Sequence, residues 1–441
     1  METKRRLKAV KRSDRTVAEI NRAFAHQKAG DLKAAASIYE TILRVNPHNF
    51  TALNLFGVLC LQERNYKKAV ELLSRATAIN ATFEQTEIHL ATALKGAAQY
   101  TEALETVSKV ISAHPENVDA LICLGNIFQE IRRYKDAIAA FSKALTLGGA
   151  RVEVLNNLGN TFAAINDATN AQECYEIALL NEPSNTRIIF NLGNLKKQTF
   201  DFINAIAQYD KLVMIDPTYR YGIGSLIHCK MYCVDWMNYD ALCNSVQKQL
   251  KESNPTIQPF QALPIFNDPE SQLLIAKLFA SQRASHHGNR HKSTSRAPGR
   301  IRLGYFSADF HNHATAYLMA QLFEKHDKDK FELYAFSFGP NCLDEMRARI
   351  STAFDHFFDV RSFSDQEIAD LSRTNDIDIA IDLKGYTQDS RPGIFNYRCA
   401  PIQINYLGFP GTMGSDVIDY IIADEVIIPP EDQFFYTEKV I

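Results

Sequence analysis

The sequence has no long apolar stretch and no cysteine pair of the C-x-x-C type. No run approaches the roughly 18 apolar residues that a membrane-spanning helix needs. The eight cysteines stand singly, mostly in apolar surroundings, as is typical of buried thiols in a reducing compartment. The formal net charge of -3 gives no general reason to expect binding to nucleic acid or to an anionic membrane. We therefore expect a cytoplasmic protein with neither of these partners.

Two segments are basic and poor in large apolar residues. Residues 1–13 have no apolar segment after them, which excludes a secretory signal of the usual pattern, and we interpret them as a basic tail. Residues 281–300 are expected to form an exposed linker. The linker contains His286, His287 and His291, which could bind a metal, but no cysteine or acidic residue accompanies them, so we favour a solvated loop.

The first half of the sequence contains a repeat of 34 residues, and three registers follow it. The first register consists of alanines: Ala35, Ala69, Ala103, Ala137, Ala171 and Ala205. The second consists of small residues: Gly57, Ala91, Gly125, Gly159 and Gly193. The third consists of aromatic or aliphatic residues: Tyr39, Leu73, Val107, Phe141, Tyr175 and Tyr209. Because all three hold at once, the pattern closely resembles the tetratricopeptide repeat.

Each repeat predicts two amphipathic helices whose backbones approach closely at the small residues. Prolines at 47, 115, 183 and 217 end the second helix, because proline cannot donate the next backbone hydrogen bond. No single helix pair buries its apolar face, so stacked repeats supply the core and form an α superhelix. We place six repeats in residues 14–217 and a helical connector with the basic linker in residues 218–300.

Asparagines recur beside the second register. They are Asn126, Asn157, Asn160, Asn191 and Asn194. An amide offers both a donor and an acceptor, so a ladder of amides can hold an extended peptide backbone without reading its side chains. The alternative is that these are ordinary solvated positions beside a tight packing contact. We favour a peptide-binding ladder because the "LGN" triplet recurs at one phase.

From residue 301 short apolar runs alternate with segments of helical period. Strands are expected at 301–307, 331–338, 356–360, 377–383, 402–408 and 419–426. Helices are expected at 315–326, 343–353, 364–374 and 390–397. This alternation predicts an α/β domain with a parallel, doubly wound sheet in residues 301–441.

Three loops leave the expected carboxyl ends of strands, where ligands bind in such sheets. They are "SADFHNH", "KGYTQDSR" and "GFPGTMG". A zinc site at His311 and His313 is a weak alternative, since an i, i+2 pair leaving a strand usually points in opposite directions. The glycine-rich loop fits neither the dinucleotide pattern nor the P-loop pattern. A catalytic histidine and a structural one are about equally compatible with the first loop.

The segments "IRLGYFSADFHNHATAYLM", "DLKGYT", "APIQINYLGFPGTMGSDVIDYIIADEVIIP" and "CVDWMNYD", behind tetratricopeptide repeats, resemble the O-linked N-acetylglucosamine transferase family with its bacterial and SPINDLY-type members. The resemblance implies an inverting, metal-free and cofactor-free transfer of a sugar from a nucleotide diphosphate to a protein Ser or Thr hydroxyl. It also implies two facing Rossmann-like lobes (the GT-B arrangement), of which residues 301–441 form the first.

The resemblance also implies site residues. The active-site histidine of the family falls on His313, its loop aspartate on Asp309 and its following hydroxyl on Thr315. Two further loops match the cleft-facing segments of the family at Gly385, Tyr386, Thr387, Pro410, Gly411 and Thr412. Family members commonly have Gly in place of His311, and several have Asn in place of Lys384, so neither residue is given a role. We favour a role for His313 in orienting the acceptor, with general base as the alternative.

The expected function is therefore that of a protein O-glycosyltransferase that transfers sugar from a nucleotide sugar to acceptors recruited by the repeats. We favour UDP-N-acetylglucosamine as the donor, with a fucose donor as the alternative. The alternative is a tetratricopeptide scaffold that binds peptides and carries an inactive α/β remnant. Only about 140 residues follow the linker, and no loop among them resembles a phosphate site with an adjacent lysine. We expect the 441-residue chain by itself to lack the second lobe and not to turn over.

Overall fold

A computed structural model describes residues 16–80, 83–282 and 299–441. It divides into two compact units, residues 1–178 and 179–441, which are described separately. The basic tail lies outside the described residues, and so do His286, His287 and His291 of the predicted linker. The domain boundaries expected from the sequence stay predictions.

The first unit is built from consecutive helices joined by short turns. After a helical segment at 16–28, the helices are α2 (Leu32–Val45), α3 (Phe50–Gln62), α4 (Tyr66–Ile79), α5 (Glu84–Gly96), α6 (Tyr100–Ala113), α7 (Val118–Glu130), α8 (Tyr134–Gly148), α9 (Val152–Ala164) and α10 (Ala168–Asn181), the last of which extends past the unit's end. Several begin at an asparagine whose side chain accepts a backbone N–H that the first turn leaves unpaired, as Asn49 does from Ala52.

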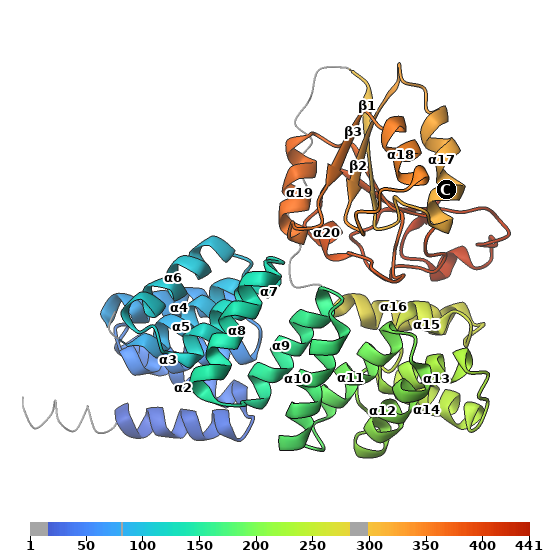
Figure 1. Cartoon of the computed structure of the whole chain (residues 1–441). Coiled ribbons are helices and arrows are strands. Elements are labelled where there is room, and N and C mark those ends of the chain that lie inside the picture. Colours follow the sequence, from blue (N-terminus) through green and yellow to red (C-terminus); the bar gives the residue numbers. More distant parts are fainter. Residues whose placement is uncertain (1–15, 81–82, 283–298) are drawn as a thin grey trace, which may run out of the picture. The chain divides into compact units, whose positions relative to one another are not determined.

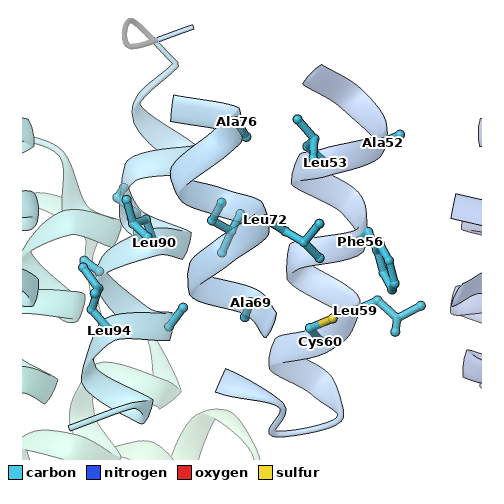
Figure 2. Close-up of a cluster of buried hydrophobic side chains, with 14 of the residues drawn as sticks. Ala52, Leu53, Phe56, Leu59, Cys60, Ala69, Leu72, Ala76, Leu90 and Leu94 are labelled. Atoms are coloured by element: carbon cyan, nitrogen blue, oxygen red, sulfur yellow. The ribbon is translucent and has the colours of Figure 1, made fainter. Parts of the chain in front are cut away.

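The core of this unit follows the repeat. The alanines of the first register are fully buried. Gly159 lies against Tyr175, and a Cβ placed on it would be 2.6 Å from the Tyr175 Cε1 atom. The small register and the aromatic register are thus the two sides of one helix–helix contact. Figure 2 shows how consecutive helices contribute to the core, with Phe56 from α3, Leu72 from α4 and Leu90 from α5. The predicted helix pairing is confirmed.

The second unit begins with further helices. They are α11 (Thr186–Gln198), α12 (Phe202–Ile215), α13 (Gly222–Tyr232), α14 (Tyr239–Lys251), the short α15 (Pro259–Ala262) and α16 (Pro269–Ser281). Tyr209 on α12 is fully buried against Gly193 of α11, which repeats the contact seen in the first unit. Beyond α12, Ile227 of α13 and Leu250 of α14 belong to a separate apolar cluster, which agrees with a helical connector.

A seven-stranded parallel sheet follows, and its order is β3-β2-β1-β4-β5-β6-β7. The strands are β1 (Ile301–Ser307), β2 (Phe331–Ser337), β3 (His356–Asp359), β4 (Ile379–Asp382), β5 (Ile402–Tyr406), β6 (Tyr420–Ile422) and β7 (Lys439–Val440). The predicted parallel sheet is confirmed. The strand expected at 419–426 is wrong in its second half, because the Asp424 carboxylate accepts the N–H groups of Val426 and Ile427 and closes a turn. Strand β7 was not predicted.

Helices cover both faces of the sheet (Figure 1). Helices α17 (Ala314–Lys325) and α18 (Glu345–Ala353) share one apolar core with Tyr305, and helices α19 (Asp365–Thr374) and α20 (Gly393–Asn396) share another with Phe306. Successive β1 side chains therefore face opposite layers, as a strand buried on both sides requires. The strand order reverses between β1 and β4. In open α/β sheets that reversal creates the crevice where ligands bind.

Candidate functional site

A buried ion pair joins the two loops at this reversal point. Asp309 follows β1 and Lys384 follows β4, and the Lys384 Nζ lies 2.9 and 2.8 Å from the two carboxylate oxygens of Asp309. Both side chains are buried, at 7% and 6% exposed. The Thr315 hydroxyl also donates to Asp309, over 3.2 Å. Asp309 therefore fixes its own loop, the start of α17 and the loop after β4 at once.

His313 stands at the exposed rim of this arrangement. It is the N-cap residue of α17, and its Nδ1 accepts the backbone N–H of Thr315 over 3.2 Å. The same Nδ1 lies 3.5 Å from an Asp309 oxygen. A neutral ring cannot serve both contacts, because accepting from Thr315 requires an unprotonated Nδ1 and donating to Asp309 requires a protonated one. We assign the Thr315 contact, which has the shorter distance and forms the helix cap.

That assignment fixes the chemistry of the ring. With Nδ1 unprotonated, the proton of a neutral imidazole is on Nε2, the nitrogen remote from the cap. His313 can then donate a hydrogen bond from Nε2 to a substrate oxygen, but it cannot take a proton there without first changing tautomer. The geometry favours an orienting role over a general base.

The turn at 385–387 and the loop at 408–414 pack against each other. Gly385 has a φ of +53°, and a Cβ there would lie 2.4 Å from the Phe409 Cβ, so only glycine fits this position. The Tyr386 hydroxyl donates to the Met413 carbonyl over 2.7 Å. Thr387 closes the turn by donating through its hydroxyl to the Lys384 carbonyl over 2.8 Å. Gly385, Tyr386 and Thr387, which the family resemblance singled out, therefore form the packed wall of the site, because the two hydroxyl groups donate to carbonyl groups of the protein.

Pro410, Gly411 and Thr412, the predicted cleft residues of the last loop, each make a different contact within the protein. A Cβ on Gly411 would lie 2.7 Å from the Phe409 ring, and the Pro410 carbonyl accepts from the Tyr436 hydroxyl over 2.9 Å. Thr412 is buried, and its hydroxyl donates to Glu438 over 2.7 Å. Burial raises the pKa of Glu438. The cleft role of Thr412 stays a prediction, but its hydroxyl is engaged within the loop.

A second carboxylate, Asp382, lies at the end of β4 behind the ion pair. Burial raises its pKa to about 7, although the backbone N–H groups of Lys384 and Gly385 and the Lys384 charge oppose this shift. Its Oδ1 accepts the Lys384 N–H over 2.9 Å. Asn405, its partner in the β5 register, has a buried Oδ1 without a hydrogen-bond partner. Asp382 therefore belongs to the support of the Lys384 loop.

The asparagines expected to bind peptide are engaged with neighbouring side chains. In the first unit the Asn157 Nδ2 donates to the Asn126 Oδ1 over 3.0 Å, which links two successive repeats. The Asn160 Oδ1 accepts from the Tyr175 hydroxyl over 2.6 Å. In the second unit Asn194 accepts in the same way from the Tyr209 hydroxyl, over 2.8 Å. The remaining member, Asn191, is half-buried on α11.

Sequence reasoning missed three contributors to the site. Lys384 was set aside, although a lysine directly after the apolar run "IDIAIDL" signals a buried partner. Asp382 sits within the same run. Glu438 had no signal at all, because it reaches Thr412 from 26 residues away. The burial of Lys384 could have been inferred from the sequence, whereas its partner Asp309 and the contact between Glu438 and Thr412 depend on long-range pairing that local patterns do not show.

Comparison with known proteins matches most of the described chain. Residues 233–441 match the model of glycosyl transferase family 41. Tetratricopeptide repeat models match residues 26–94, 89–151 and 186–219. Within the described residues, no helix combines the length and the apolar character that crossing a membrane requires.

Curated relatives match parts of the chain. The probable UDP-N-acetylglucosamine–peptide N-acetylglucosaminyltransferase SEC of Arabidopsis thaliana is 34% identical over 198 residues, which is 42% of this chain and 20% of that protein. The UDP-N-acetylglucosamine–peptide N-acetylglucosaminyltransferase of Caenorhabditis elegans is 36% identical over 141 residues, 32% of this chain and 12% of that protein. The chain thus spans a fifth or less of these relatives. A solved mutant O-GlcNAc transferase of Thermobaculum terrenum aligns with a TM-score of 0.48 at 22% identity, covering 74% of this chain and 56% of that one.

Proposed function

We propose that this chain, a relative of the O-linked N-acetylglucosamine transferase family, acts in the transfer of a sugar from a nucleotide diphosphate to Ser or Thr hydroxyls of proteins. The observation that carries the proposal is the placement of His313. It caps a helix at the carboxyl edge of the sheet, at the point where the strand order reverses, and a buried ion pair fixes its loop. Ligands bind at this edge in open α/β sheets.

The reaction forms a bond between the acceptor oxygen and the anomeric carbon as the bond to the diphosphate breaks, with inversion at that carbon. His313 would donate from Nε2 to the acceptor and hold its oxygen in line for attack. The hydroxyl proton then leaves to solvent or to another acceptor. Asp309 and Lys384 act as positioning residues, since they keep the loop and the helix start in one arrangement.

The preferred donor is UDP-N-acetylglucosamine, because it appears in the names of the curated relatives. A fucose donor is the alternative. The tetratricopeptide repeats are the surface proposed to recruit protein acceptors. All eight cysteines are free thiols, which agrees with a cytoplasmic location. Transfer through these residues requires neither a metal nor a cofactor.

A non-catalytic scaffold remains the second candidate. The observation in its favour is that several matched residues, Thr387 and Thr412 among them, use their hydroxyls within the protein. A scaffold would bind acceptor proteins through the repeats without transferring sugar.

The test is a radiolabelled transfer assay with UDP-N-acetylglucosamine and cell-extract acceptors. It is run with the 441-residue chain alone and with the chain joined to the nucleotide-binding lobe of a family 41 enzyme, because the family resemblance implies that this lobe holds the nucleotide. Transfer in either arm that depends on His313 supports the proposal. Folded protein that binds acceptors but transfers nothing in either arm contradicts it and favours the scaffold.

A further inference from the structure

Three side chains of different ligand type meet beside His313, outside the transfer machinery. They are His311, Cys342 and Asp344, and within the described residues they form the one such group, with ligand atoms all within 4.8 Å of one another. We propose that they form a binding site for a divalent transition metal of the zinc type.

The group comes from two loops that the fold already holds together. His311 follows β1, whereas Cys342 and Asp344 lie between β2 and α18. Because β1 and β2 are parallel neighbours, their carboxyl ends emerge side by side. Gly339 approaches the β1 loop so closely that a Cβ on it would lie 1.7 Å from the Ala308 oxygen. The contact between the loops is therefore part of the fold and does not depend on a metal.

Asp344 is held in place by the backbone. Its Oδ2 accepts the N–H of Asn312, over 3.0 Å, and its Oδ1 accepts the N–H of Arg347, over 2.8 Å. These two backbone donors fix the orientation of the carboxylate, and each oxygen keeps a further lone pair for a metal.

The donor set selects the ion. Imidazole, thiolate and carboxylate are the three ligand types of zinc sites, whereas magnesium and calcium take oxygen ligands. In a tetrahedral site the Zn–N and Zn–S distances place the nitrogen and sulfur about 3.6 Å apart. Side-chain rotations that move the ligand atoms by about 1 Å would therefore bring the three side chains to binding distance of one ion. Thiolate and carboxylate together also balance the charge of a divalent ion. Three protein ligands leave the fourth position to water.

The nearby cations have partners of their own. Arg347 and Arg361 lie close enough to Cys342 to interact with it electrostatically. Arg361 forms a two-oxygen contact with Asp359, and Arg347 donates to the Phe310 carbonyl and the Ser337 hydroxyl. Their guanidinium groups are therefore directed to other acceptors.

This assignment differs from the zinc site considered from the sequence, which paired His311 with His313. The two rings are 5.8 Å apart between centroids, and their planes are inclined at 62°. His313 uses its Nδ1 for the α17 cap. His311 instead finds its partners in the neighbouring loop, which the i, i+2 spacing could not reveal. The proposed metal ties two loops together and takes no part in sugar transfer.

Cobalt(II) is the probe, because a cobalt–thiolate bond gives a charge-transfer absorption that imidazole and carboxylate ligands alone do not give. All proteins in the comparison carry His286, His287 and His291 as alanine, so that the linker histidines cannot bind the ion. We expect reduced protein to develop the thiolate band with one equivalent of cobalt and to lose it when zinc is added.

The variants locate the ligands. Cys342→Ser should abolish the band, and His311→Ala should weaken cobalt binding about 100-fold or more. Asp344→Asn should also weaken it while keeping the α18 cap, because asparagine caps helices as well as aspartate does. Cys233→Ser is the matched control, since Cys233 is an exposed thiol outside the group, and it should leave the band unchanged. A parent protein without the band, or a band that survives Cys342→Ser, would overturn the proposal.

Discussion

The repeat helices and the α/β sheet satisfy their buried polar groups in different ways. In the first unit, partners recur with the repeat, as when Asn157 bonds to Asn126 on the preceding repeat or Tyr175 to Asn160 within one. In the sheet, Asp309 and Lys384 form a buried pair across 75 residues, a contact that follows no repeat. A periodic contact can be lost from one repeat while the others remain. The loss of a single buried pair is not offset by equivalent contacts elsewhere. Substitution should therefore lower the unfolding free energy more in the sheet than in the repeats.

The largest effect is expected for Lys384→Met, which leaves the Asp309 carboxylate buried with only Thr315 as a polar side-chain partner. Removing one member of a buried pair costs about 3–5 kcal/mol of unfolding free energy. The change compared with it in the repeats is Arg151→Met, which breaks an exposed pair with Asp119 and should cost about 1 kcal/mol or less.

Urea unfolding followed by labelling of buried thiols separates the two regions, because Cys399 reports on the sheet and Cys123 on the repeats. The double variant Asp309→Asn/Lys384→Met should recover part of the loss, since it leaves no unpaired charge. Equal costs for Lys384→Met and Arg151→Met would contradict the comparison.

The next largest effect concerns catalysis. His313→Ala should lower sugar transfer about 100-fold or more, the scale of the loss when a reactant is no longer held in position. His311→Ala should lower it much less, because the family resemblance implies that Gly is tolerated at this position. His313→Asn serves as the folding control, because asparagine can keep the α17 cap while it removes the ring. Equal losses from the two alanine variants would show that the assignment between the histidines is wrong.

The sequence predicted the fold in proportion to its periodicity. Ala171 and Gly159 were placed correctly because the same contact recurs in five or six repeats of the sequence. The comparisons confirm the resemblance to tetratricopeptide repeats and to the glycosyltransferase family. The parallel sheet followed from the alternation of strands and helices. Strand β7 was missed because two residues carry no pattern. The support of the site was missed because Lys384 finds Asp309 only through the strand order, which local composition does not encode.

The pH dependence of stability tests the buried carboxylate of the sheet. Burial raises the pKa of Asp382 from 3.8 to about 7, so the folded state binds a proton that the unfolded state releases between these values. Its contribution to stability is full below about pH 4 and is lost as the pH rises through 7. Asp382→Asn should remove this loss, so the variant should gain stability relative to the parent from pH 5 to 8. A constant difference in the urea midpoint, followed by near-ultraviolet circular dichroism, would contradict the assignment.

A smaller effect is expected in the repeats for Gly159→Ala. Overpacking against Tyr175 costs about 1–3 kcal/mol, and the better helix propensity of alanine returns about 1 kcal/mol. The third repeat already carries Ala91 opposite Val107, both fully buried. Gly159→Ala should therefore cost less in a Tyr175→Val background, as a double-mutant cycle of unfolding free energies would measure. Additive costs would mean that the two registers do not share one contact.

The smallest effect concerns the proposed asparagine ladder, where the comparison between the regions is weakest. Alanine at 157, 160, 191 and 194 should weaken the binding of a pool of extended, serine-containing peptides, because a neutral hydrogen bond contributes about 0.5–1.5 kcal/mol. The substitutions at 160 and 194 are paired with Tyr175→Phe and Tyr209→Phe, so that no buried hydroxyl loses its acceptor. Helicity should change little, because the side-chain amides that are removed take no part in the backbone hydrogen bonds of the helices. The Tyr→Phe pair alone is the control for fluorescence anisotropy, and affinities equal to that control would show that the side-chain amides do not bind the peptide.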